Sequence, residues 1–239
     1  MNLTVKVLLG MALGIVVGLA INLGGLSPAG SFVNEYLVDG LFLVVGKLFV
    51  NALKMMVVPL VLFSLICGVC GIGDIRLLGR IGTKAFVLYI LTTAIAIATG
   101  ILLAAGLGIG EGMNAVTETV FTGKDSPPLS EVLINIVPSN PVSAMATGEM
   151  LAIIFFAILC GVGMLMVGKK AQPVVEFVEL LNEVMMKMVT IIMALAPYAV
   201  FCLLAKAIGS LGLDLLVKLM GYVAVLISVL LFHLFVTLQ

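Results

Sequence analysis

The chain is built from apolar runs that are long enough to cross a lipid bilayer. A transmembrane helix needs about 20 mostly apolar residues. The sequence contains six such stretches, which we place at residues 5–23, 41–72, 85–106, 129–167, 184–208 and 215–238. Because 63% of the residues are hydrophobic and only 10% are charged, a soluble fold, in which about half of the residues are polar, is excluded. The sequence predicts an all-α, polytopic membrane protein with six transmembrane helices.

Basic residues gather in alternate connections between these runs. Arg76, Arg80 and Lys84 follow the second run, and Lys169 and Lys170 follow the fourth. Since cytoplasmic loops carry the excess of lysine and arginine, we expect the N-terminus in the cytoplasm, and six crossings return the C-terminus there. The formal net charge is zero, so the chain has no basic excess of the kind that binds nucleic acid.

The fourth run is predicted to be broken. Two prolines precede it, and Pro138 and Pro141 interrupt it; each proline removes a backbone donor and disfavours helix in the residue before it. We expect three pieces, at about 129–137, 141–145 and 149–167. A broken element is tolerated at membrane depth only where protein or water covers it, so an interface between subunits or domains is expected here.

The first and second spans contain residues that indicate how these helices pack. Gly10, Gly14 and Gly18 form a double GxxxG in the first span, which lets a second helix backbone approach closely. The second span is longer than one perpendicular crossing needs, and its Lys47 and Lys54 should face protein or water, or snorkel, because a charge at depth is expensive.

Two segments share a short pattern. Lys54-Met is followed by Pro59-x-x-x-Phe in the second span, and Lys187-Met by Pro197-x-x-x-Phe in the fifth. These spans are expected to run in opposite directions, so the pattern suggests an inverted repeat of three plus three spans, which is frequent in secondary transporters.

Three oxygen-bearing side chains lie on one face of the third span. Tyr89, Thr92 and Thr93 occur in LYILTT at helical spacing. One interpretation is that the threonines bond back to carbonyls one turn earlier and the tyrosine reaches an interface or a neighbouring helix. The other is a site for a hard cation such as sodium, which takes oxygen ligands. The residues alone leave both open.

The remaining candidates point to packing. Cys67 and Cys70 have CxxC spacing, but their apolar neighbours favour small filler residues over a redox or metal site. His233 is expected to pack near the cytoplasmic end of the sixth span, since a proton relay would need a carboxylate partner there. Glu149 suits the first turn of a helix, where it would favour the dipole. No nucleophile-and-base spacing, metal cluster or cofactor loop is present, so an enzyme is not expected, and no cofactor is expected other than sodium as a coupling ion.

Several blocks together resemble the dicarboxylate/amino acid:cation symporters, the glutamate-transporter family. FVNALKMMVVPLVLFSLICGVCGIGDIRLLGRIGTKA is similar to the family's second-to-third helix region, and LYILTT to its third-helix motif. SPPLSEVLINIVPSNPVSAMATGEMLAIIFFAILCG resembles the broken fourth helix, and MVTIIMALAPYAVFCLLA the fifth. The likeness covers essentially the whole chain.

The resemblance implies a fold. Members are homotrimers in which helices one, two, four and five form a scaffold, while helices three and six belong to a transport domain that moves across the membrane. The expected division is scaffold helices one and two at 1–84, helix three at 85–106, an extracellular loop at 107–128, scaffold helices four and five at 129–208, and helix six at 214–239. The family's re-entrant hairpins and helices seven and eight have no counterpart in these residues, so we expect an N-terminal scaffold half.

The resemblance also implies a site and a function. In these symporters a Tyr-x-x-Thr-Ser/Thr motif on helix three contributes to a sodium site that an Asn and an Asp of helix seven complete; Tyr89, Thr92 and Thr93 match it. The implied activity is sodium- or proton-coupled symport of acidic amino acids or C4-dicarboxylates, in a bacterial-type inner membrane. No substrate residue falls within this chain. The alternatives are a non-transporting oligomeric scaffold, a half-transporter that needs a separate C-terminal half, and a pore formed by oligomers.

Overall fold

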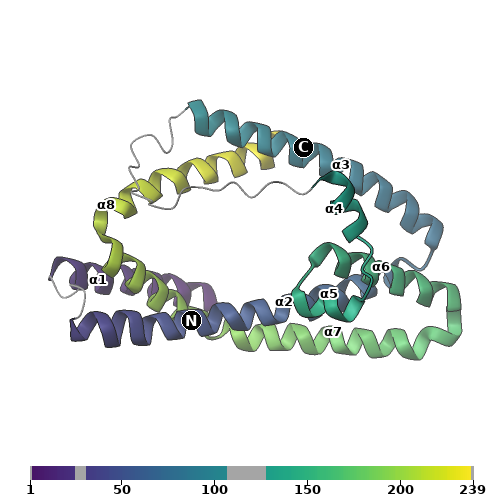
Figure 1. The fold of residues 1–239 in the computed structure, drawn as a ribbon, viewed down its shortest axis with the longest axis horizontal. Helices are drawn as coiled ribbons and strands as arrows, with labels where there is room; N and C mark the ends of the chain where they lie inside the picture. Colours follow the sequence, from purple (N-terminus) through teal and green to yellow (C-terminus); the bar gives the residue numbers. More distant parts are fainter. Residues whose placement is uncertain (1, 25–30, 107–127, 238–239) are drawn as a thin grey trace. The chain divides into compact units, whose positions relative to one another are not determined.

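The computed structural model describes residues 2–24, 31–106 and 128–237, and every element in them is helical (Figure 1). The elements are α1 (Leu3–Leu23), the π-helical η1 (Val33–Phe42), α2 (Leu43–Ile72), α3 (Ile75–Gly106), α4 (Leu129–Asn135), α5 (Pro141–Thr147), α6 (Met150–Val167), the 3₁₀ turn η2 (Gly168–Ala171), α7 (Gln172–Met193), α8 (Ala196–Phe232) and the π-helical η3 (His233–Thr237). The loop predicted at 107–128 lies outside the described residues, apart from Pro128.

Four helical segments among the described residues are long and apolar enough to cross a membrane. They are Leu3–Leu23, Val33–Ile72, Ile75–Leu103 and Met150–Met193. Two shorter apolar segments, Ala196–Ser210 and Val223–Phe235, follow them. The part of the chain that the structure describes is therefore built of helices alone, and the protein passes through the membrane several times. The predicted total of six crossings stays a prediction.

Three predicted boundaries were wrong. The charged connection after the second span is helical from Ile75 onward, because arginine and lysine are good helix formers and their charge indicates exposure to water rather than a loop. The fifth span does not begin near residue 184 but continues from α7, and the helix breaks at Ala194 and Leu195 instead of near residue 209. Pro197 explains this break, since proline suits the first turn of a helix but cannot bond to the carbonyl four residues earlier.

The chain forms two compact units. The first unit comprises Met1–Ile75 and Leu129–Leu213, and the second comprises Arg76–Pro128 and Asp214–Gln239. Most of α3 and the later part of α8 thus belong to the second unit. The other helices and the first part of α8 belong to the first unit.

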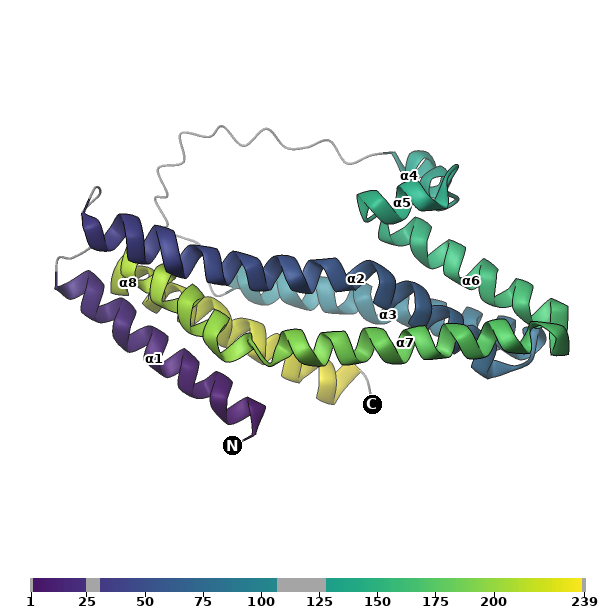
Figure 2. The ribbon, with the colours of Figure 1, turned by 90° about the horizontal axis from the view of Figure 1, so that it is seen from below.

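One core of the first unit lies where α2 packs against α6 and α7. Ile66, Ala157 and Val178, one from each helix, are buried together. α2 and α7 lie side by side in both views (Figures 1 and 2). Cys67 and Cys70 are packed against this cluster, and the Cys70 thiol lies 3.9 Å from the main-chain oxygen of Gly161. Both cysteines therefore pack as small apolar residues, as predicted.

A second core joins α1 to the first part of α8. The three glycines of the double GxxxG are buried in α1 and face, in order, Pro197, Phe201 and Ile208. Because the residue numbers rise together on both helices, α1 and this part of α8 run in the same direction. Towards their C-terminal ends, the Asn22 amide donates a hydrogen bond to the Gly209 carbonyl at 3.2 Å. The predicted role of the glycines in helix packing is confirmed.

The fourth run is broken as predicted. It consists of α4, α5 and α6, and Asn140 caps α5 by accepting hydrogen bonds from the backbone amides of Val142 and Ser143 at 3.0 and 3.3 Å. Such a cap satisfies amides that have no partner inside the helix.

The predicted inverted repeat is not supported in the same way. Pro59 lies inside the continuous α2, whereas Pro197 lies in the first turn of α8, so the inverted repeat stays a prediction.

The reversal between α6 and α7 depends on Gly168. Its backbone has φ +68° and ψ −140°, a region open essentially to glycine alone. We expect Gly168→Ala to destabilise the first unit by about 1–3 kcal/mol. Gly163→Ala is the matched control, because a Cβ there meets nothing within 4 Å; it should be neutral or stabilising by up to about 1 kcal/mol. Thermal unfolding of the purified chain in detergent measures both, and equal midpoints would contradict the role of Gly168.

Candidate cation site on helix α3

The LYILTT segment lies in the middle of α3, within the second unit. Thr92 and Thr93 are half-buried, whereas the Tyr89 side chain is 68% exposed. The helical spacing of three and four residues places the two threonines on the same side as Tyr89. The structure thus brings the three predicted residues together along one side of one helix.

The hydroxyl of Thr92 is tied to the main chain of Tyr89. Thr92 Oγ1 donates a hydrogen bond to the Tyr89 carbonyl oxygen at 3.1 Å. A hydroxyl that donates its proton keeps its lone pairs available as acceptors. Within the described residues, Thr93 makes no hydrogen bond. The bond from Thr92 to a carbonyl of the preceding turn is the one that the packing interpretation predicts for this residue, and the cation interpretation stays a prediction.

The same half-buried stripe continues towards the C-terminal end of α3. It includes Ala96, Thr99 and Gly100. Thr99 Oγ1 donates to the carbonyls of Ile95 and Ala96 at 2.9 and 3.0 Å. Sequence reasoning did not single out Thr99, although its spacing of seven residues from Thr92 was a signal for the same face.

This arrangement suits a hard cation. Hydroxyl and carbonyl oxygens are ligands for such ions, whereas zinc and other transition metals prefer imidazole and thiolate. In the part of the chain that the structure describes, no group of three His, Cys, Asp or Glu side chains could hold a metal ion. Tyr89, Thr92 and Thr93 therefore stay a predicted part of a cation site, to which further ligands would have to be added.

The other candidate residues have local surroundings of their own. Glu149 is the N-cap of α6, and its carboxylate accepts a hydrogen bond from the Thr147 hydroxyl at 3.0 Å, so it stands at the helix start where it was expected. His233 is half-buried, and its Nδ1 atom is buried without a hydrogen-bond partner in the described structure. Lys47 and Lys54 are exposed on α2.

The long apolar helices define a multi-pass membrane protein. Comparison with known sequences makes this specific: the profile of the sodium:dicarboxylate symporter family matches residues 3–239, and the chain belongs to that family. The family resemblance deduced from the sequence is therefore confirmed.

Characterised relatives have names that agree. A proton/sodium-glutamate symport protein of Bacillus caldotenax is 35% identical over 98% of this chain and 55% of its own length. A C4-dicarboxylate transport protein of Bacillus subtilis is 31% identical over 89% of this chain and 49% of its own length. A proton/glutamate-aspartate symporter of Escherichia coli is 32% identical over 88% and 50%. The chain thus spans about half the length of the relatives that it matches.

Proposed function

We propose that this chain takes part in cation-coupled symport of acidic amino acids or C4-dicarboxylates, with sodium or protons as the coupling ion. The observation that carries the proposal is the placement of Tyr89, Thr92 and Thr93 along one side of α3, in a chain of the sodium:dicarboxylate symporter family. The names of the relatives support the substrate class.

In this proposal α3 provides part of a sodium site. The hydroxyl oxygens of Thr92 and Thr93 face the ion, and Tyr89 lies on the same side of the helix. An Asn and an Asp of the family's seventh helix, which belongs to the half of the relatives that this chain does not match, complete the site. The carboxylate balances the charge of the ion, since hydroxyls and carbonyls contribute only dipoles.

The division of the chain into two compact units supports different roles for the two parts. We assign the first unit, with α1, α2 and α4 to α7, to the scaffold, and the second unit, which carries α3 and the later part of α8, to the moving transport domain. The proposed assembly is a homotrimer in a bacterial-type inner membrane, with the N-terminus in the cytoplasm. The basic residues at the start of α3 and in η2 support this orientation.

Uptake by proteoliposomes that contain the complete protein tests the function. We expect labelled glutamate, aspartate or succinate to accumulate when a sodium or proton gradient is imposed, and accumulation to stop when the gradient is collapsed. Each acidic substrate should compete with the others of its class, while neutral amino acids should not. Ion conductance without any substrate-dependent uptake would contradict the proposal and indicate a pore.

A further inference from the structure

A groove opens between α1 and the start of α8, within the first unit. Its volume is about 270 Å³. The lining residues come from both helices and from the break before α8: Lys6, Leu9, Gly10, Leu13, Ala194, Pro197, Tyr198 and Phe201. The groove lies along the line where Gly10 and the carbonyl of Pro197 approach each other closely, so both of its walls are held by the helix packing described above.

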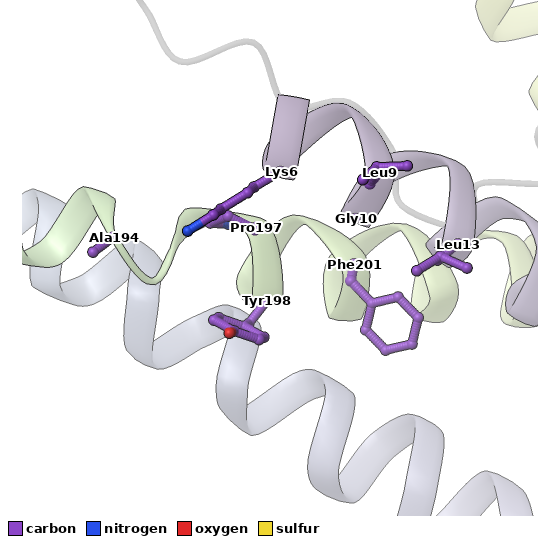
Figure 3. Close-up of a pocket in the computed structure, with 8 residues that line it drawn as sticks. All are labelled: Lys6, Leu9, Gly10, Leu13, Ala194, Pro197, Tyr198 and Phe201. Atoms are coloured by element: carbon purple, nitrogen blue, oxygen red, sulfur yellow. The ribbon is translucent and has the colours of Figure 1, made fainter. Parts of the chain in front are cut away.

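The groove is polar at one end and apolar at the other. Lys6 extends along α8 towards Ala194 and Pro197, whereas Leu9, Leu13 and Phe201 line the opposite end (Figure 3). The Tyr198 side chain, which is 68% exposed, adds a phenol group to the lining. The groove therefore offers a cation and a hydroxyl at one end, and a hydrophobic channel at the other.

The polar end corresponds to the expected membrane boundary. Lys6 lies in the first turn of α1, a helix of 21 residues, and the N-terminus is expected in the cytoplasm. Leu13 is seven residues further on, about 10 Å deeper at the helical rise. Within the described residues Lys6 has no ion-pair partner, so its ammonium group is available to an anion from outside the chain.

We propose that this groove binds an anionic phospholipid of the cytoplasmic leaflet. The lipid phosphate pairs with the Lys6 ammonium group, the Tyr198 hydroxyl donates to a headgroup or ester oxygen, and one acyl chain lies against Leu9, Leu13 and Phe201. The cytoplasmic leaflet carries the anionic lipids that basic residues attract. A soluble anion would use the cation but not the apolar half of the groove, and a neutral lipid would leave the charge unpaired. This inference does not depend on the proposed transport activity.

Thermal unfolding of the purified chain with added lipid tests the proposal. We expect phosphatidylglycerol to raise the unfolding midpoint more than phosphatidylcholine does. Lys6→Gln should reduce the phosphatidylglycerol-specific shift at least several-fold. Lys170→Gln is the control, because Lys170 is an exposed cation of η2 outside the groove, and it should keep the full shift. An equal shift in the Lys6 and Lys170 variants would overturn the proposal, as would an equal shift with the two lipids.

A second variant separates the headgroup from the acyl chain. Leu13→Trp should fill the apolar end and reduce the lipid effect while Lys6 remains in place. Inorganic phosphate and glycerophosphoglycerol, which have no acyl chain, should not reproduce the effect of the lipid. If either soluble anion does so, or if Leu13→Trp leaves the shift unchanged, the groove is not a phospholipid site. Native mass spectrometry of both variants should show the corresponding loss of bound phosphatidylglycerol.

Discussion

Replacing Gly14 by leucine should detach α1 from α8 and destabilise the first unit by about 3 kcal/mol, the upper end of the usual effect of overpacking. A Cβ atom at Gly14 would lie 2.7 Å from the main-chain oxygen of Phe201 and 3.1 Å from the Leu204 Cβ. The first of these neighbours is backbone, so it cannot move aside by changing a rotamer. Within a membrane, packing contacts of this kind drive helix association.

The thiol of Cys202 reports this change directly. Cys202 is 7% exposed and is buried with Ile21 of α1 and Phe42 of η1. In Gly14→Leu we expect faster alkylation of Cys202 by a maleimide, measured by peptide mass spectrometry, while Cys160 in the other core keeps its rate. Gly68→Leu is the control, because a Cβ at Gly68 meets nothing within 4 Å. Unchanged Cys202 labelling in Gly14→Leu would show that α1 is not held in this way.

Thr92→Ala and Thr93→Ala should each weaken the apparent affinity for sodium by about 10- to 100-fold in the complete protein. Each substitution removes one oxygen ligand from a cation. An interaction of a polar group with a charge contributes about 1.5–3 kcal/mol, and each 1.4 kcal/mol is a factor of ten. The measurement is the sodium concentration that gives half-maximal uptake of the acidic substrate by proteoliposomes. Thr92→Ser should restore most of the affinity, since it keeps the hydroxyl.

Two controls distinguish the cation site from general helix effects. Thr99→Ala removes a hydroxyl from the same half-buried stripe, but Thr99 lies seven residues, about 10 Å along the helix, from Thr92, too far to share one ion with it, so the sodium dependence should not change. Ser228→Ala should also have little effect, because it removes a hydroxyl that is back-bonded to the Ala224 carbonyl on α8, outside the motif. If Thr92→Ala and Thr93→Ala transport with unaltered sodium dependence, α3 does not bind the coupling ion.

The sequence predicted those parts of the fold that depend on local chemistry. Prolines and the Asn140 cap marked the pieces of the fourth run, and the double GxxxG marked a close helix contact, because each of these acts within a few residues. The predicted start of the third helix, which was inferred from the charged residues before it, was wrong. The charge pattern predicts a loop at Arg76 and Arg80, but both lie in α3, because a helix that extends past the hydrocarbon core can carry such residues. Which helix packs against α1 could not be predicted, since many helices can accept a glycine stripe.

For the candidate site, the sequence predicted that three residues share one face of α3, but not which of their atoms form hydrogen bonds. The spacing of Tyr89, Thr92 and Thr93 was sufficient to place them on one face. That Thr92 donates to the Tyr89 carbonyl depends on the helix backbone and on the rotamer of Thr92. Periodicity carries no information about either. The groove beside Lys6 was also beyond prediction, because it exists only where two distant segments meet.

The continuity of α3 has a mechanical consequence. From Ile75 to Gly106 it is a single helix of 32 residues, about 48 Å long, and it contains no proline at which it could bend. It is thus one uninterrupted helix, with arginines at one end and the two threonines near its middle. If α3 moves as a rigid helix, Arg76 and Arg80 travel the same distance as Thr92 and Thr93.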